Sequence, residues 1–148
     1  MMRKQVILVI GCGILIFSCP HLTIAAEMGQ VAESKDQSSV VAAQTWLAMV
    51  DKGQYEQSWE TASAYFKSMV TREQWVSQVA AVRNPLGNLI SRDLKMHQYQ
   101  KTMPGAADGE YYVLSFNAVF ENKASAVETV TVMKDKDGQW RLAGYFIK

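Results

Sequence analysis

The chain has 148 residues, a length that allows one domain of ordinary size. Its 15 lysines and arginines nearly balance 14 aspartates and glutamates, so no charge excess indicates nucleic acid or an anionic membrane as a partner. Hydrophobic residues make up 49% of the chain, enough for a packed core, whereas two cysteines and two histidines are too few for a disulfide framework or a histidine–cysteine metal cage.

The first 26 residues have the three-part layout of a cleaved signal peptide. Two basic residues precede an almost uncharged apolar run at 6–19, and small residues at 23–26 have the spacing that a signal peptidase requires. Cleavage after Ala25 and cleavage after Ala26 both fit. The apolar run is shorter than the roughly 20 residues that span a bilayer, so we expect no stable transmembrane segment after cleavage.

We therefore expect an exported protein, either periplasmic or secreted. Lipoprotein anchoring at Cys12 or Cys19 is the alternative, because the residues before each cysteine loosely resemble a lipoprotein box. Cutting at Cys12 would leave an apolar run exposed, and Phe17 is bulky for its position before Cys19, so cleaved export is favoured. The mature chain then has no cysteine and only His97 as a histidine, which excludes thiol catalysis and thiolate metal sites.

Residues 27–37 are polar and lack a periodic apolar face, which predicts a flexible lead-in to a single domain at 38–148. The domain begins with three predicted helices. Apolar residues recur at helical spacing in the first, which is expected to stop at Lys52-Gly53, and in the second, which starts near Gln54. Their stripes are Val40, Ala43, Leu47 and Val50 in the first, and Tyr55, Trp59, Ala62 and Phe66 in the second.

The third helix is predicted to open with a capping box formed by Thr71 and Gln74 and to end at Asn84-Pro85. Its buried face is expected to carry Trp75, Val79 and Val82.

From Gly87 onward the apolar period changes to two, which predicts four antiparallel strands. A weak strand around 94–98 is followed by a clear strand at 110–120, a β-branched run at 127–134 and a final strand at 139–147. Asp137-Gly138 is typical of a two-residue hairpin turn between the last two.

A two-residue turn would place Glu128 opposite Ile147, Val132 opposite Ala143 and Met133 opposite Leu142. In this register the predicted core face carries Trp140, Leu142, Phe146 and Met133, and Glu128 lies on the other face. Because a slip of one residue inverts every side chain, the register decides which residues are buried. Together the elements predict an α+β fold, in which three N-terminal helices pack on a curved four-stranded antiparallel sheet.

Several phrases resemble a family of short exported bacterial proteins, catalogued as a domain of unknown function numbered four thousand and nineteen. They are WVSQVAAVRNPLG at 75–87, MPGAADGEYYVLSF at 103–116, AVETVTV at 126–132 and DGQWRLAGYFIK at 137–148. The resemblance covers the chain from about Val40 to its end. It implies a cystatin-like cone similar to nuclear transport factor two and the ketosteroid isomerases, in which helices close the wide end of a bent sheet. The family has no established activity, so the resemblance identifies no catalytic residue.

Glu128 and His97 are the residues weighed for acid–base chemistry. Glu128 stands in an apolar β-run, either as a general base inside the cone or as a carboxylate on the convex face paired with Arg92 or Arg141. We favour the ion pair. His97 follows Asp93 by four residues, a separation of about 13 Å along a strand, so a catalytic pair within the strand is not expected and a structural or solvent-facing histidine is.

Arg92, Tyr112, Phe116 and Trp140 are the candidate ligand-binding residues at a pocket mouth, although most aromatic residues are expected to form core. No motif indicates a cofactor, a metal site or a catalytic residue.

The sequence therefore favours an exported, non-catalytic binding or assembly domain at the cell envelope. Its partner would be a small apolar ligand, an envelope protein or a second copy bound through the sheet. One alternative is an enzyme of the isomerase or dehydratase type, which requires Glu128, Asp93 or His97 to point into a cavity. The other is a purely structural homodimer.

Overall fold

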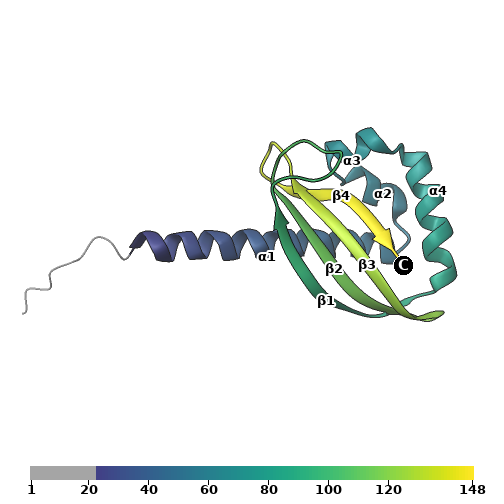
Figure 1. Ribbon diagram of the computed structural model, residues 1–148. Helices are drawn as coiled ribbons and strands as arrows, with labels where there is room; N and C mark the ends of the chain where they lie inside the picture. Colours follow the sequence, from purple (N-terminus) through teal and green to yellow (C-terminus); the bar gives the residue numbers. More distant parts are fainter. Residues whose placement is uncertain (1–22) are drawn as a thin grey trace, which may run out of the picture.

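The computed structural model describes residues 23–148, with side chains from Asp36 onward (Figure 1). Most of the predicted signal peptide, including Cys12 and Cys19, lies outside the described residues.

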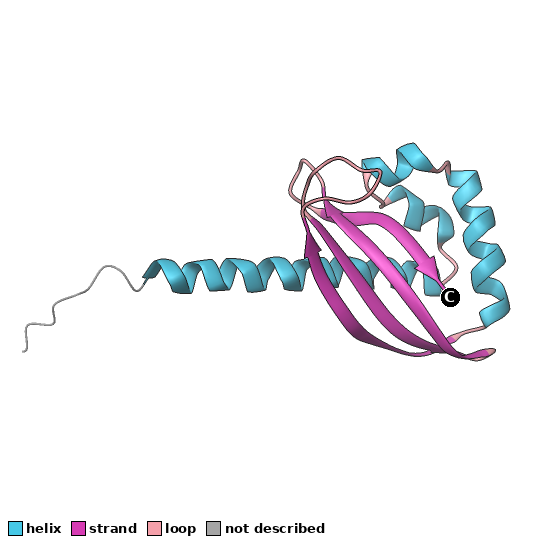
Figure 2. Cartoon of the chain, in the orientation of Figure 1, coloured by secondary structure: helices cyan, strands magenta, loops and turns pink. Residues whose placement is uncertain are grey.

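Within residues 23–148, four α-helices and a 3-10 turn precede four strands. The elements are α1 (Thr23–Asp51), α2 (Tyr55–Glu60), α3 (Ala64–Met69), α4 (Arg72–Arg83), η1 (Asn84–Leu86), β1 (Leu89–Gln100), β2 (Tyr111–Phe120), β3 (Lys123–Lys134) and β4 (Trp140–Ile147). The strands form one antiparallel sheet in the order β1-β2-β3-β4. The sheet is curved and the helices cover one of its faces (Figure 2), so the predicted α+β class is confirmed.

Helix α1 is longer than the sequence pattern predicts. It begins at Thr23, so residues 27–37, expected as a flexible lead-in, are helical, and its first half extends beyond the sheet (Figure 1). It ends at Asp51, directly before the stop predicted at Lys52-Gly53, and Gly53 has a φ of 71°, which suits glycine. The N–H of Gly53 donates to the carbonyl of Val50, and the N–H of Gln54 donates to that of Met49, which closes the last turn.

The segment predicted as one second helix is divided into α2 and α3. Ser63 interrupts it, because its backbone is extended and its hydroxyl accepts a hydrogen bond from the N–H of Phe66, capping α3. The N–H of Ser63 donates to the carbonyl of Leu142 in β4 at 2.9 Å. The apolar stripe of the sequence fits one helix as well as two, so periodicity alone does not reveal the break.

Helix α4 carries the predicted capping box: the N–H of Gln74 donates to the Thr71 hydroxyl, and the N–H of Thr71 donates to the Gln74 side chain. Its predicted face needs one correction. Val82 is 46% exposed, and the neighbouring Arg83 is buried instead. Arg83 stands four residues after Val79, on the same helical stripe.

The β3–β4 hairpin has a three-residue loop rather than the predicted two-residue turn. The N–H of Asp135 donates to the carbonyl of Gln139, and Gly138, with a φ of 81°, donates to the carbonyl of Asp135. The longer loop shifts the register by one residue near the turn, so Met133 pairs with Arg141 and Val132 pairs with Leu142.

A bulge at Ala143 then reverses this shift, and Glu128 pairs with Ile147 as predicted. The predicted core face is therefore correct for Leu142 but wrong for Phe146, which is 61% exposed. Met133 is also not in the core, and Glu128, predicted for the convex face, lies on the helix-covered face and is 0% exposed.

The main core lies between the helices and the concave face of the sheet. It includes Trp46 and Leu47 of α1, Trp75 of α4, and Leu114 and Val130 of the central strands. Within residues 23–148, no helix combines the length and the apolar character that crossing a membrane requires.

Candidate functional site

Four charged side chains and a tyrosine meet inside the domain, where α1 and α4 end against the sheet. We call Asp51, Arg83, Arg92, Glu128 and Tyr145 the buried ionic cluster. Glu128 is its centre. Its Oε1 accepts hydrogen bonds from Nη1 of Arg83 at 3.0 Å and from the Tyr145 hydroxyl at 2.6 Å, and its Oε2 accepts one from Nε of Arg92 at 2.6 Å.

Asp51 links the same two arginines from the other side. Its Oδ1 accepts from Nη2 of Arg83 at 2.5 Å and from Nη2 of Arg92 at 2.9 Å, and its Oδ2 accepts from Nη1 of Arg92 at 2.7 Å. Each guanidinium therefore bridges both carboxylates, and the four formal charges sum to zero. Such charge-assisted bonds are stronger than neutral ones.

Local structure explains how Arg83 enters the core. It lies in the last turn of α4, where the free carbonyl groups favour a cation, and its guanidinium carbon lies 4.4 Å from the ring centroid of Phe120. Asp51, by contrast, ends α1, where an anion is unfavourable unless cations face it.

The cluster perturbs two of its members. Burial by itself lowers the pKa of Arg92, but the hydrogen bonds and charges of Asp51 and Glu128 outweigh burial and raise that pKa above its usual range. Burial raises the pKa of the Tyr145 hydroxyl, and the neighbouring Glu128 carboxylate raises it further. Both groups therefore stay protonated at neutral pH, as anchors of Glu128.

This geometry supports the ion-pair interpretation of Glu128. It is paired with Arg92 and also with Arg83, while Arg141 bonds instead to Asp135 and Asp137. Both carboxylate oxygens are occupied and the side chain has no exposed surface. Glu128 therefore stabilises the packing of the elements around it, and has no free oxygen for a substrate proton.

Replacing Glu128 tests this role. The Glu128→Gln variant keeps the shape but leaves two buried guanidinium groups with one anion, so we expect it to lower the free energy of unfolding by about 3 kcal/mol in urea denaturation. Glu60→Gln is the control, because the Glu60 side chain is 59% exposed and its ion pair with Arg72 is 3.8 Å long. It should change stability by less than about 0.5 kcal/mol. Equal losses in the two variants would contradict the assigned role.

A second polar contact holds α1 farther along the sheet. We call Asp36, Ser39, His97 and Tyr112 the α1 anchor. The Ser39 hydroxyl donates to the carbonyl of Asp36 at 2.8 Å and lies 2.9 Å from Nε2 of His97. The Tyr112 hydroxyl donates to the Asp36 carboxylate, and the His97 ring stacks on Tyr112 with centroids 4.3 Å apart.

The α1 anchor does not activate Ser39 as a nucleophile. The Ser39 hydroxyl is in hydrogen-bond contact with the Asp36 carbonyl, and in the tautomer protonated at Nε2 His97 donates to the Ser39 oxygen. Ser39 is also 0% exposed. His97 thus has a structural role, and Asp93 is exposed on the same strand. Burial and the bond to Asp36 raise the pKa of Tyr112 above its usual range.

Between the α1 anchor and the buried ionic cluster, α1 and the β3–β4 hairpin enclose a groove of about 520 Å³. We call it the α1–hairpin groove. Its walls combine apolar side chains, two of them tryptophans, with polar and charged ones, and Val41 is 49% exposed. Val41, Trp46 and Met49 come from α1, and Lys134, Trp140 and Arg141 come from the hairpin. No carboxylate or imidazole lies among the described residues that line it.

A second, polar cavity of about 380 Å³ lies beside the buried ionic cluster, with Asp51 and Arg83 in its wall. Glu128, Asp93 and His97, the three groups that an enzyme would need, line neither cavity. Within the described residues, no three histidine, cysteine or acidic side chains are grouped to hold a metal ion.

The four predicted pocket-mouth residues do not come together. Trp140 lines the α1–hairpin groove, Arg92 belongs to the buried ionic cluster, Tyr112 belongs to the α1 anchor, and Phe116 is core. They share the concave face as strand alternation predicts, but the helices cover that face.

Sequence reasoning missed Asp51 and Val41, whereas Arg83 was expected, like Arg92, to pair with a glutamate or with backbone carbonyl groups, and it pairs with Glu128. Asp51 follows Ala43 and Leu47 at steps of four, as Arg83 follows Trp75 and Val79. A charged residue that falls on an otherwise apolar, buried stripe of a helix indicates that its side chain forms an ion pair within the core.

Comparison with protein families places this chain among proteins whose activity is unassigned. The family model described as "Protein of unknown function (DUF4019)" matches residues 42–145, which include every residue of the buried ionic cluster and all of the β3–β4 hairpin except the last two residues of β4. No curated protein matches this chain.

Proposed function

The chain belongs to this family, and since the family's description assigns no activity, we propose from the site itself that the chain is an exported, non-catalytic binding domain of the cell envelope. In this proposal the α1–hairpin groove receives an apolar group, either of a small ligand or of another envelope protein. The observation that carries the proposal is the composition of the groove.

Two tryptophans, Trp46 and Trp140, lie in the groove beside the half-exposed Val41. Ligand sites are usually concave and lined by apolar and aromatic side chains with a few polar groups. Buried apolar surface contributes about 25 cal/mol per Å², so covering Val41 and the partly exposed Trp140 favours binding, while Trp46 is already buried and forms the floor. Lys134 and Arg141 also line the groove, and their charged groups would orient the polar part of a ligand.

The enzyme alternative receives less support from the same groove. Acid–base catalysis needs a group within hydrogen-bond reach of the substrate. The described lining offers only Lys134 and Arg141 as ionisable groups, and Arg141 is bonded to two aspartates. An isomerase or dehydratase of the expected type would use a carboxylate or an imidazole in this place.

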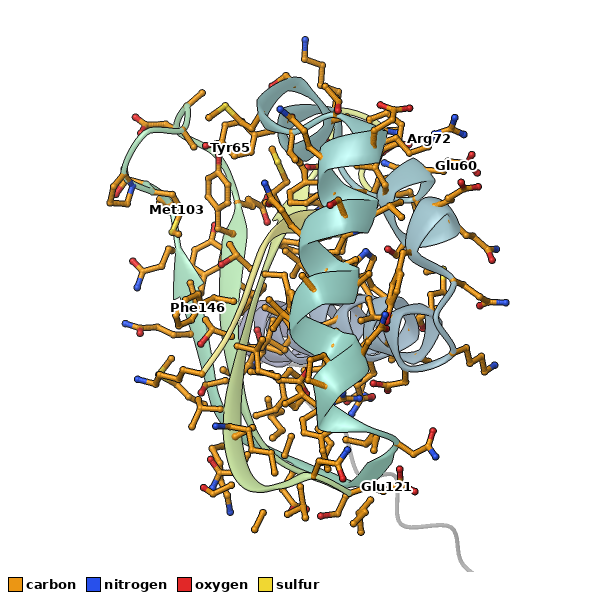
Figure 3. The ribbon with its side chains drawn as sticks, turned by 90° about the vertical axis from the view of Figure 1, so that its right-hand side faces the viewer. Glu60, Tyr65, Arg72, Met103, Glu121 and Phe146 are labelled. Atoms are coloured by element: carbon orange, nitrogen blue, oxygen red, sulfur yellow. The ribbon has the colours of Figure 1, made fainter. Side chains whose placement is uncertain are left out.

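The homodimer alternative is supported by exposed apolar side chains on the convex face of the sheet, which the helices do not cover. Met96, Ser115, Thr129 and Phe146 form one row across the four strands on the convex face. Phe146 is 61% exposed and Met96 is 43% exposed, and Figure 3 shows Phe146 on the side of the sheet away from α4. Pairing of two sheets would bury this row, and it would leave the α1–hairpin groove free.

A charge placed in the groove tests the binding function. With the neutral apolar dye Nile red as the probe, we expect Val41→Asp to weaken binding at least about tenfold, because a carboxylate in an apolar groove must be desolvated. Val82→Asp is the matched control: Val82 is 46% exposed, on α4 and away from the groove, and its variant should bind like the parent. Fluorescence titration measures both. Equal binding by the two variants would refute the groove as the site.

Export is tested by the mass of the protein recovered after expression of the full chain with its leader. We expect intact-mass spectrometry to find a chain that starts at Ala26 or Glu27, without Cys12 and Cys19. A lipid-modified cysteine at the N-terminus would instead establish anchoring, and a chain that retains residues 1–25 would contradict export by cleavage.

A further inference from the structure

The edge of β4 beside the α1–hairpin groove has backbone groups directed away from the sheet. Hydrogen-bonded and non-hydrogen-bonded pairs alternate along an antiparallel ladder. Asp135 and Gln139 are a bonded pair, since the N–H of Asp135 donates to the carbonyl of Gln139. The next pair, Lys134 and Trp140, is therefore not bonded, and the N–H of Lys134 donates toward β2, to the carbonyl of Glu110.

It follows that the N–H and the C=O of Trp140 both point to the free edge of the sheet. Within residues 23–148, no backbone or side-chain group is bonded to them across that edge. β4 is the last strand of the sheet, so no further strand of the domain covers this position. An unpaired strand edge is a template for another extended chain.

The domain already uses the neighbouring position in this way. The carbonyl of Leu142, two residues along β4, accepts a hydrogen bond from the backbone N–H of Ser63 at 2.9 Å. This bond shows that a backbone group of β4 directed toward the free edge can form a hydrogen bond with the backbone of another segment, here the residue that precedes α3. It also bounds the open stretch beside the groove, which consists of Trp140 and the N–H of Leu142 and matches a short peptide.

We propose that the α1–hairpin groove binds an extended peptide that adds to β4 opposite Trp140; this inference rests on the proposed binding function of the groove. The peptide residue opposite Trp140 donates to the Trp140 carbonyl and accepts from the Trp140 N–H. Its side chain lies on the same sheet face as the Trp140 indole, toward Val41 and Trp46 of α1. That residue is apolar, while its two neighbours face outward and are unrestricted.

The charges that line the groove determine which other residues the peptide should contain. The groove lining has two cations and no carboxylate among its described residues, and Arg141 is already bonded to Asp135 and Asp137. The ammonium of Lys134 lies 5.9 Å from the ring centroid of Trp140, and its Glu110 partner is 4.0 Å away, at the outer limit of an ion pair. A carboxylate two residues from the apolar position, on the same face, would pair with Lys134. The favoured partner is thus an acidic extended peptide with one central apolar residue.

Selection from a phage-displayed random heptapeptide library against the purified protein tests the proposal. We expect enriched peptides to share an apolar residue with Asp or Glu two positions away, and to be lost against Val41→Asp but retained against Val82→Asp. N-methylation of the apolar residue in a synthetic copy should weaken binding about fivefold or more, because it removes one backbone hydrogen bond. Amide NMR shifts should change most at Trp140 and Leu142.

Lys134→Gln should remove the preference for acidic peptides, and Lys136→Gln, an exposed hairpin lysine outside the groove lining, should not. The inference falls if no peptide is enriched, if N-methylation has no effect, or if the shifts map elsewhere. Nile red binding that depends on Val41 without any peptide binding would overturn the peptide while preserving the groove as an apolar ligand site. Nile red binding that ignores Val41→Asp would overturn the groove itself.

Discussion

The pairing of the Glu128 carboxylate with Arg83 and Arg92 governs how the helices meet the sheet. A carboxylate without exposed surface is tolerated only when cations and hydrogen bonds replace its water, and here they come from α4, β1 and β4. Both arginines are shared with Asp51, the last residue of α1. Moving α1, α4 or β1 would separate a charged side chain from its partners in the core, so the cluster favours one arrangement of these elements over its alternatives.

The position of α1 creates the groove. The buried ionic cluster holds the C-terminal end of the helix, and the α1 anchor holds it about four turns earlier through Asp36 and Ser39. Val41 and Trp46 lie between these contacts and face the hairpin. Buried ion pairs often stabilise a fold no better than apolar packing does. In this domain we regard their contribution as positional, because they keep α1 at a distance from β4 that leaves room for a binding partner.

Much of the fold follows from local patterns in the sequence. The set of residues on the concave, helix-covered face of the sheet does not. The capping box at Thr71, the stop at Gly53 and the four strands depend on neighbouring residues, so they are predictable. The face of Glu128 depends on a three-residue loop and a bulge at Ala143, whose opposite shifts cancel along the hairpin and leave no trace in the apolar pattern. The buried ionic cluster joins residues up to 94 positions apart, from Asp51 to Tyr145, a proximity that local spacing does not contain.

A double-mutant cycle on Asp51 and Arg92 tests the central claim most directly. The free energy of unfolding would be measured for Asp51→Asn, Arg92→Met and the double variant. If the cluster joins α1 to the sheet, the coupling energy between the two side chains should exceed about 1 kcal/mol. A coupling energy near zero would mean that α1 is held by apolar packing alone, and it would contradict the account of how the groove is formed.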